Sequence, residues 1–383
     1  MPSEIIESIF QQLCPYQKGV VTAADDVPPR QRFFAISVGG TPRWLVPHDY
    51  KQGLPTLRQW RPYTPTSLAK WHTLLRLYRL GLLGYLPGVQ SFGVSGIRSV
   101  DWNYLSWDFH VPPDITIYVG TPGPTRKAVV TFAQPETGRL VSIMKIPLGT
   151  RAVDSITQEA NALRNLEKNR TKVAPKLQYH DPASGWSLQE AINGYPAGSR
   201  LTNDHYIFIQ KLYNASSFTT LTILAASLLD RLVHLSSLSS EELFSINHIL
   251  NQIHDDTFLA TGWVHGDFAP WNLKWVSDNK LMAVDWEFAE SNSPAGLDLI
   301  HYLCRVNKLA KSSNVSAESF ESTIINAMKK FSMGLYPLRK EFLKKYFRYY
   351  LVWYQIVLEE RGIVDSTRLN YYRITRELLN ESL

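Results

Sequence analysis

The chain has 383 residues, of which 44% are hydrophobic, 12% aromatic and 19% charged, a composition that predicts a folded protein with about two or three structural units. Forty Lys and Arg against 34 Asp and Glu give a net charge of +6, which is too small to indicate nucleic-acid binding. Two cysteines, Cys14 and Cys304, exclude a disulfide framework and a four-thiolate zinc site, and they favour a reducing, cytoplasmic location.

Two features argue against secretion and membrane insertion. The segment MPSEIIESIF is acidic where a signal peptide would be basic. Every apolar run is shorter than the roughly 18 residues of a membrane span, and the run around Leu74 is broken by Arg76 and Arg79. We therefore expect no integral membrane association.

Clusters of proline and glycine divide the chain into three expected parts. Residues 1–113 form an N-terminal accessory module, residues 114–193 a β-rich unit, and residues 194–383 a mostly helical unit. The accessory module is rich in large apolar side chains that need a surface to bury against, so we expect it to be attached to the rest of the chain. These include Trp44, Trp60, Trp71, Trp102 and Trp107.

Local patterns predict the elements of the first two parts. In the accessory module, residues 33–38 and 43–47 flank a glycine turn and predict a hairpin. A helix is predicted from an N-capping Ser67 to Leu83; its basic, amphipathic pattern also occurs in membrane-surface helices, but we favour a packed helix with a solvated face. The second part has predicted strands at 115–119, 128–132, 140–146 and 186–192, and a predicted helix at 154–168.

One segment of the third part carries the chemistry. It reads His265-Gly266-Asp267-Phe268-Ala269-Pro270-Trp271-Asn272, and is followed by LKWV, a turn at 277–280, LMAV and then Asp285. The pattern predicts a loop, a β-hairpin and a carboxylate at the end of the return strand. Asp267, Asn272 and Asp285 are then expected to converge, and their oxygen atoms suit Mg²⁺.

The spacing matches a known pattern. Asp267 and Asn272 are five residues apart, as in the protein-kinase catalytic loop, and Asp285 stands where the kinase Asp-Phe-Gly aspartate stands. Together with His265, this pattern resembles the aminoglycoside phosphotransferase/choline kinase family. The resemblance runs from about residue 115 to residue 303 and leaves out the first hundred residues. It implies an α+β, two-lobed protein-kinase-like fold, with a small β-rich lobe, a larger helical lobe and an extra N-terminal module.

The resemblance implies roles for the residues of the catalytic segment. Asp267 resembles the catalytic base that deprotonates the acceptor hydroxyl, and His265 resembles the histidine that braces the loop. Asn272 and Asp285 resemble the magnesium ligands. Asp298 resembles the aspartate that steadies the catalytic loop from the next helix. Glu287 has two open interpretations, as an aid to metal binding or as a hydrogen-bond acceptor nearby.

The β-rich part supplies the residues that the resemblance assigns to the nucleotide. Lys145 looks like the lysine that grips the α- and β-phosphates, and Glu159 looks like its ion-pair partner on the following helix. The segment 189–192, with Glu190 and Ile192, resembles the hinge whose backbone meets a nucleobase.

The phosphate-covering loop is expected at 120–127. Its glycines Gly120 and Gly123 could let backbone N–H groups approach a phosphate, but its two prolines remove donors, and the loop does not match G-x-G-x-x-G.

The implied reaction is Mg²⁺-dependent transfer of the γ-phosphoryl group of ATP or GTP to a hydroxyl. Only twelve residues separate Asp285 from Asp298 and no Ala-Pro-Glu follows, so a small-molecule acceptor is favoured over a protein. The segment 301–383 holds fourteen Lys and Arg against eight Asp and Glu, which favours a neutral or anionic acceptor. The abundance of aromatic residues, whose faces pack on sugar rings, slightly favours a sugar as the acceptor.

Two alternatives stay open from the sequence. A nucleotide-binding pseudokinase or scaffold is supported by the irregular loop at 120–127, and is opposed by the intact set of Asp267, Asn272 and Asp285. A protein kinase is the less favoured alternative.

Two further features are expected to belong to the core, namely Cys304 and an aromatic stripe at helical spacing, for which sugar stacking is the other interpretation. The stripe consists of Tyr346, Tyr350, Trp353 and Val357.

Overall fold

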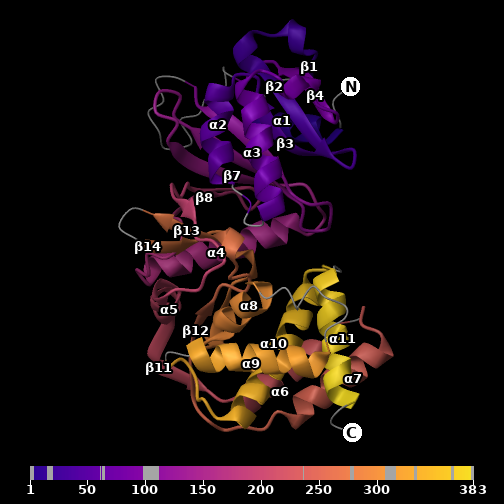
Figure 1. Ribbon diagram of the computed structural model, residues 1–383, viewed down its shortest axis with the longest axis vertical. Helices are drawn as coiled ribbons and strands as arrows, with labels where there is room; N and C mark the ends of the chain where they lie inside the picture. The colour runs from indigo at the N-terminus through magenta and orange to yellow at the C-terminus, as the bar shows by residue number, and fades with distance from the viewer. Residues whose placement is uncertain are drawn as a thin grey trace. The chain divides into compact units, whose positions relative to one another are not determined.

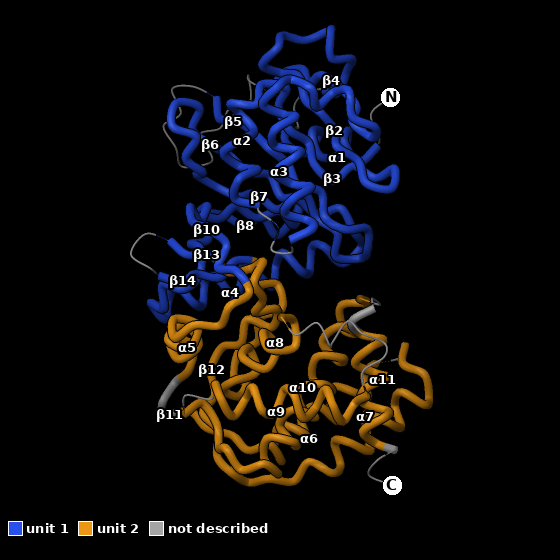
Figure 2. Tube along the Cα trace, viewed as in Figure 1, with its two compact units in different colours: residues 1–198, 274–284 blue, residues 199–273, 285–383 orange. Residues whose placement is uncertain are grey.

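The computed structural model describes residues 4–14, 20–60, 62, 65–97, 112–235, 237–276, 280–306, 316–331, 334–363 and 366–380 (Figure 1). The chain forms two compact units (Figure 2). Unit 1 comprises residues 1–198 and 274–284, and unit 2 comprises residues 199–273 and 285–383. Unit 1 is built on a large sheet and unit 2 is mostly helical, so the predicted α+β class with a β-rich and a helical unit is confirmed. No helix in the described part of the chain is long and apolar enough to cross a membrane.

A nine-stranded sheet forms the framework of unit 1, in the order β1-β4-β2-β3-β5-β6-β7-β9-β8. The predicted hairpin is present as β2 and β3, and the predicted strands of the second part are present as β5, β6, β7 and β9. The strands are β1 Val21–Thr22, β2 Arg32–Val38, β3 Thr41–Pro47, β4 Val89–Val94, β5 Asp114–Val119, β6 Lys127–Ala133, β7 Leu140–Pro147, β8 Leu177–His180 and β9 Ser187–Glu190.

The N-terminal strands continue the sheet of the second part. Strands β3 and β5 pair antiparallel, with Trp44 opposite Tyr118 and Leu45 opposite Ile117. The expected boundary at residue 113 therefore falls inside one sheet and one compact unit. Of the five tryptophans expected to anchor the N-terminal part, Trp102 and Trp107 lie outside the described residues.

Helices cover the sheet of unit 1. Helix α1, Glu4–Leu13, buries its apolar face in a cluster with side chains of β2, β3, β4, β5, β6 and β7. Helices α2, Tyr50–Gln59, and α3, Pro65–Arg79, contribute to a second cluster. The predicted helix at 154–168 is α4, Ala152–Lys168, which contacts β7, β8 and β9.

Helix α3 differs from its prediction at both ends. It begins at Pro65, whose fixed φ suits the first helical position, so Ser67 lies inside the helix and is not its cap. It ends before Gly81, whose φ of 72° is the left-handed conformation typical of a helix C-terminus. Its basic residues are exposed while Leu75 and Tyr78 are buried, as expected for a packed helix with a solvated face.

A second, three-stranded sheet also belongs to unit 1. Its order is β10-β13-β14, from Tyr195–Pro196, Leu273–Val276 and Lys280–Ala283. Strands β13 and β14 are the hairpin predicted after Asn272; residues 277–279 of its expected turn lie outside the described residues. The hairpin was expected within the helical part, 194–383, whereas residues 274–284 group with unit 1.

Unit 2 contains seven helices in its described residues and a small sheet, β11-β12-β15, that the sequence did not predict. Helix α10 contacts α6, α7, α8, α9 and α11, and the aromatic stripe on it is buried, which confirms core packing. The elements are α5 Asn203–Gln210, β11 Tyr213–Thr219, α6 Leu221–Leu232, α7 Ser240–Gln252, β12 Leu259–Val264, β15 Glu290–Pro294, α8 Leu297–Val306, α9 Ala317–Phe331, α10 Lys340–Glu360 and α11 Ser366–Asn380.

Candidate active site

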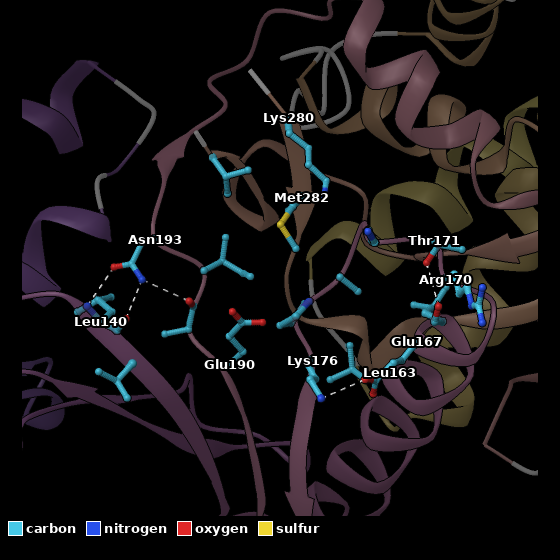
Figure 3. A pocket seen from close by; sticks show the side chains of 18 of the residues that line it. Leu140, Leu163, Glu167, Arg170, Thr171, Lys176, Glu190, Asn193, Lys280 and Met282 are labelled. Atoms are coloured by element: carbon cyan, nitrogen blue, oxygen red, sulfur yellow. Dashed lines mark hydrogen bonds and ion pairs between the residues drawn. The ribbon is translucent and has the colours of Figure 1, made fainter. Parts of the chain in front are cut away.

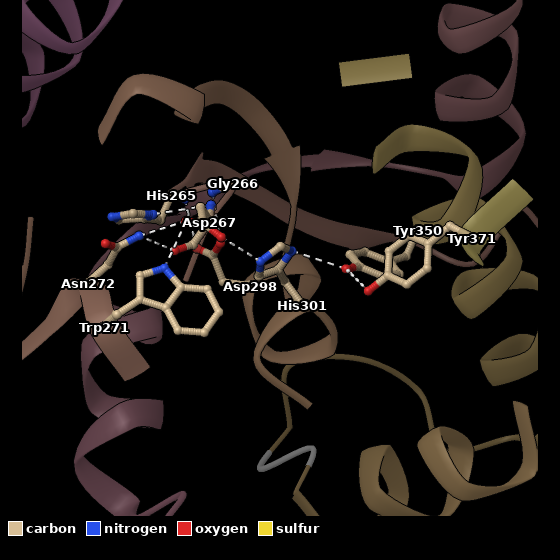
Figure 4. Close-up of polar contacts among 9 residues, drawn as sticks. All are labelled: His265, Gly266, Asp267, Trp271, Asn272, Asp298, His301, Tyr350 and Tyr371. Atoms are coloured by element: carbon tan, nitrogen blue, oxygen red, sulfur yellow. Dashed lines mark hydrogen bonds and ion pairs between the residues drawn. The ribbon is translucent and has the colours of Figure 1, made fainter. Parts of the chain in front are cut away.

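The loop that follows β12 is fixed by helix α8. The carboxylate of Asp298, in the first turn of α8, accepts hydrogen bonds from the backbone N–H groups of His265 at 2.8 Å and Gly266 at 3.1 Å (Figure 4). Gly266 has a φ of 81°, and a Cβ there would lie 2.3 Å from the carbonyl oxygen of Phe288. The loop can therefore take this path only with glycine at this position.

Asp298 makes the contact that the sequence predicted for it. The side chain is fully buried, and burial raises the pKa of its carboxyl to about 7; the two backbone hydrogen bonds oppose this shift and nearby Asp267 adds to it. Two oriented backbone donors are the only hydrogen bonds that the described residues give this carboxylate. Asp298 thus acts on the loop backbone and leaves Asp267 to face outwards.

The carboxylate of Asp267 receives three side-chain donors (Figure 4). Its Oδ2 accepts from Trp271 Nε1 at 3.2 Å and from Asn272 Nδ2 at 2.8 Å. Its Oδ1 lies 3.0 Å from His301 Nε2. A carboxylate offers about four acceptor positions. Oδ2 is fully used, so Oδ1 retains the position at which a further proton can be accepted.

Neighbouring groups keep Asp267 ionised. Burial raises the pKa of its carboxyl, but the hydrogen bond from His301 and the positive charge of Arg305 outweigh burial and hold the pKa below its ordinary value. Arg305 lies with its guanidinium 4.7 Å from the ring centre of Trp271. The side chain that could take a proton is therefore anionic at neutral pH.

A chain of buried side chains runs inwards from His301. Its Nδ1 lies 3.1 Å from the hydroxyl of Tyr350, which in turn lies 3.4 Å from the hydroxyl of Tyr371. Burial lowers the pKa of His301, so the ring is neutral at pH 7. The tautomer that satisfies both neighbours carries its proton on Nε2, donates to Asp267 and accepts from Tyr350.

His265 takes a different contact from His301. Its ring packs 4.6 Å from the ring of Trp286, and its Nδ1 accepts a hydrogen bond of 3.3 Å from the backbone N–H of Asp267. The ring is buried and lies inside the loop. This is the geometry of the bracing role that the resemblance implied.

Asn272 and Asp285 carry the oxygen atoms that would hold Mg²⁺. The amide nitrogen of Asn272 donates to the backbone oxygen of Asp267 at 2.9 Å and to its carboxylate, which directs the amide oxygen away from both. Asp285 is half-buried and has a left-handed conformation, with φ 69°. One amide oxygen and one carboxylate are hard ligands that fit Mg²⁺. No group of three or more His, Cys, Asp or Glu side chains in the described residues is placed to hold a metal ion.

Lys145 and Glu159 meet inside unit 1. The Nζ of Lys145, on β7, lies 2.7 Å from Oε1 and 2.6 Å from Oε2 of Glu159, on α4. Both side chains are buried, with exposed fractions of 5% and 1%. A carboxylate that grips the ammonium with both oxygens fixes the direction of the lysine side chain.

The loop between β5 and β6 is held by the connection that precedes α4. The carbonyl of Arg126 accepts hydrogen bonds from the N–H groups of Leu148 and Gly149, both at 2.9 Å, and that of Pro124 accepts one from Arg151 at 2.8 Å. Gly120 donates its own N–H to the carbonyl of Lys127, so this donor is used within the hairpin.

Two guanidinium groups flank the same loop. The side chain of Arg43 donates to the hydroxyls of Tyr118 at 2.6 Å and Thr121 at 3.2 Å, and Arg126 donates to the carbonyl of Gly120 at 3.1 Å. Burial and the charge of Arg43 both lower the pKa of Arg126.

The predicted hinge borders a cavity of about 600 Å³ in unit 1 (Figure 3). Glu190 and Ile192 both line it, together with residues of β7, α4 and the β13–β14 hairpin. Lys145, Glu159 and the loop glycines do not line it. The carbonyl oxygen of Ile192 accepts a hydrogen bond of 3.2 Å from Lys274 Nζ.

Sequence reasoning missed several of these contacts. His301 was not singled out, although it stands three residues after Asp298 on the same helix, and residues at that spacing share a helix face. The donors Trp271 and Lys274 lie within or next to the recognised segment. Nothing in the local sequence marks Arg43, because its contact depends on the pairing of β3 with β5.

Ion pairs engage part of the basic C-terminal segment. Five of its fourteen basic residues, all of them arginines, pair with carboxylates in the described residues. The pairs are Arg339 with Asp255, Arg348 with Glu321, Arg368 with Glu242 and Glu359, Arg373 with Glu377, and Arg376 with Glu241. Glu287 is buried and its backbone carbonyl accepts a hydrogen bond from Arg361.

Comparison with known proteins finds likeness only in solved structures. The chain is similar to choline kinase LicA from Streptococcus pneumoniae, with 14% identity and a TM-score of 0.43 over 66% of this chain and 89% of that one. It is similar to the wild-type aminoglycoside 2'-phosphotransferase-IIIa in its GDP complex, with 14% identity and a TM-score of 0.43 over 70% and 93%. It is also similar to an aminoglycoside phosphotransferase from Alicyclobacillus acidocaldarius, with 13% identity and a TM-score of 0.36 over 69% and 88%.

These are the kinds of protein that the catalytic segment resembles. No protein-family model and no curated protein sequence matches the chain.

Proposed function

We propose that this protein is a phosphotransferase that moves the γ-phosphoryl group of a nucleoside triphosphate to a hydroxyl of a small molecule. The observation that carries the proposal is the carboxylate of Asp267, which is ionised, held by three donors and left with one acceptor position on Oδ1. A structural aspartate buried in this way would have its acceptor positions filled by protein donors.

Asp267 performs the acceptor side of the reaction. Its Oδ1 takes the proton of the acceptor hydroxyl while the hydroxyl oxygen forms a bond to the γ-phosphorus. The bond from that phosphorus to the β–γ bridging oxygen breaks, and the nucleoside diphosphate leaves with the electron pair. Trp271 and Asn272 hold Oδ2 and His301 holds Oδ1, so the Asp267 carboxylate cannot rotate freely. It therefore meets the acceptor hydroxyl in one orientation, which favours proton transfer.

Asn272 and Asp285 would hold Mg²⁺ through the amide oxygen and the carboxylate. When bound, the ion neutralises charge on the triphosphate. The protein's own contribution is the orientation of Asn272, whose amide nitrogen is tied to Asp267. Base and metal ligand are thereby held in one rigid unit of the loop.

Lys145 and Glu159 perform the donor side. The buried carboxylate of Glu159 points the ammonium of Lys145, which grips the α- and β-phosphates. The loop at 120–127 offers few free backbone donors, since it contains two prolines and uses the N–H groups of Gly120 and Arg126 internally. The guanidinium groups of Arg126 in the loop and of Arg43 on β3 beside it would supply N–H donors in place of the backbone donors of a glycine-rich loop.

We infer a small-molecule acceptor with a neutral or anionic character, a sugar among the candidates. The support is the short connection of twelve residues between Asp285 and Asp298, which leaves no room for a peptide-docking segment. The buried aromatic stripe on α10 gives no support to a sugar, because none of its rings is exposed.

The test is a screen of sugars, amino alcohols and other hydroxyl metabolites for acceptor-dependent release of nucleoside diphosphate, with ATP and GTP and with Mg²⁺. Phosphorus NMR of the product identifies the new phosphoester. The proposal expects turnover that Asp267→Asn abolishes. Nucleotide binding with Mg²⁺ but no turnover on any acceptor would favour a pseudokinase, and transfer to generic protein substrates would favour a protein kinase.

A further inference from the structure

Lys274 places an ammonium group against the predicted hinge. Its Nζ donates to the carbonyl oxygen of Ile192 at 3.2 Å and to Oε1 of Gln59, at the end of α2, at 3.3 Å. No carboxylate pairs with Lys274 among the described residues. Lys274 as a residue is half-buried, and its ammonium meets only neutral oxygens, so one of its three donors and its charge remain uncompensated by the described residues.

Gln59 is brought to this place by the N-terminal strands. The next residue, Trp60, packs its ring 5.3 Å from that of Trp44 and 4.9 Å from that of Tyr118. Trp44 pairs with Tyr118, Tyr118 with Val129, and Val129 with Lys145 in successive strands. Directly paired residues point to the same face of a sheet. Gln59 therefore reaches Lys274 from the face that carries Lys145.

The polar side chain that directly follows the predicted hinge is already used. Asn193 accepts from the N–H of Leu140 at 3.0 Å and donates to its carbonyl at 2.7 Å (Figure 3). Lys274, by contrast, offers an uncommitted donor next to the carbonyl of Ile192.

We propose that Lys274, positioned by Gln59, makes the protein select a guanine nucleotide over an adenine nucleotide as phosphoryl donor. The inference rests on the proposed function and on the role that the resemblance implies for segment 189–192, which is to meet the nucleobase. Adenine carries an amino group at C6, which donates and needs an acceptor at the hinge. Guanine carries a carbonyl oxygen there, which accepts. An ammonium has donors only, so it binds the guanine oxygen and opposes the adenine amino group.

The test measures binding, so it needs no acceptor. Dissociation constants for GTP and ATP with Mg²⁺ are determined by calorimetry for the wild type and for Lys274→Met, which keeps the length of the side chain and removes the ammonium. We expect the wild type to bind GTP more tightly, and Lys274→Met to weaken GTP binding on the order of tenfold with little change for ATP, because a hydrogen bond to a charged group is lost. Lys51→Met, an exposed lysine on the same α2 helix as Gln59, is the matched control and should change neither.

Two further variants separate selection from folding. Lys274→Arg keeps a positive donor and should keep the preference for GTP, and Gln59→Leu should reduce it by releasing the ammonium from its second partner. Thermal melting checks that each variant is folded. Equal binding of ATP and GTP by the wild type, or an equal loss of both in Lys274→Met, would overturn the inference while leaving the phosphotransferase proposal standing. Binding of neither nucleotide would overturn the proposed function and this inference with it.

Discussion

Each donor to Asp267 sets a different property of the proposed base. Asn272, which is itself a proposed metal ligand, and Trp271 both donate to Oδ2. His301 donates to Oδ1, the oxygen that would also accept the proton of the acceptor hydroxyl. A change at Asp267 itself should therefore act on transfer and not on nucleotide binding.

Asp267→Asn retains the shape of the side chain and removes the proton acceptor. Turnover should fall by roughly 10²- to 10⁴-fold while the dissociation constant for nucleotide changes little.

Asp285→Asn removes a metal ligand, so it should weaken Mg²⁺-dependent nucleotide binding together with turnover, and Lys145→Ala should chiefly raise the KM for nucleotide. The measurements are calorimetry with and without Mg²⁺ and steady-state kinetics. Near-normal turnover in Asp267→Asn would show that the proposed base is wrong.

His301 should tune the pH dependence of turnover. Its hydrogen bond lowers the pKa of Asp267, so removing the donor raises that pKa. In wild type, Asp267 therefore stays ionised to a lower pH than an ordinary aspartate does. His301→Leu should lower kcat roughly 10- to 100-fold by loosening the base, and should move the acid limb of the pH profile to higher pH.

The conservative variant separates tuning from packing. His301→Gln places an amide N–H near the position of Nε2 and should recover part of kcat and most of the acid limb. A change in kcat without any movement of the acid limb would mean that His301 only fills space.

At the scale of the elements, the catalytic loop depends on a close approach between two chain segments. Gly266→Ala would introduce a Cβ 2.3 Å from the carbonyl of Phe288 and would force a side chain into φ 81°. We expect a loss of at least ~2 kcal/mol in the free energy of unfolding, together with loss of turnover. Gly334→Ala is the matched control, because Gly334 has the same φ of 81° with nothing within 4 Å of the added Cβ. Chemical denaturation of both variants measures the difference. Equal losses would show that the approach to Phe288 is not limiting.

The strands and helices of the second part could be predicted because their signals are local. The β-branched and aromatic run at 115–119, the strand at 140–146 after a tight turn, and the helical period at 154–168 are each complete within one segment, and β5, β7 and α4 form there. The Lys145–Glu159 contact followed from the resemblance and needed only this order of elements. The small sheet β11-β12-β15 was missed, since its strands are distant in sequence and are joined with register shifts.

At the scale of the whole molecule, the sequence was least informative about which segments share a unit. The two prolines at 112–113 indicated a domain boundary, but β3 and β5 pair across it. The sequence of a strand does not specify which other strand it pairs with. Likewise, the β13–β14 hairpin follows the catalytic loop in the chain and yet groups with unit 1. His301 was missed for a similar reason, because a donor on α8 becomes visible only when α8 is placed beside the loop.

The shared sheet predicts that the N-terminal strands are needed for the rest of unit 1. Leu45 on β3 is fully buried in the cluster that also contains Ile117, Val130 and Ile146. Leu45→Asp would bury a charge there and should lower the free energy of unfolding by about 3 to 5 kcal/mol. Val38→Asp, in the same hairpin but 69% exposed, is the matched control and should change it by about 0.5 kcal/mol or less.

Nucleotide binding tests whether residues 1–113 and residues 114–193 fold as one unit. If residues 1–113 and 114–193 form one cooperative unit, Leu45→Asp should weaken nucleotide binding as well as the N-terminal part, because the same cluster supports β7, which carries Lys145. Limited proteolysis of the wild type should then leave the N-terminal part protected, and Leu45→Asp should expose both parts to cleavage at the same rate. Rapid release from the wild type of an active fragment that begins near Asp114 would contradict this. A Leu45→Asp variant that loses its N-terminal part to protease but binds nucleotide normally would also contradict it. The sheet would then be stable with β5 as its edge strand.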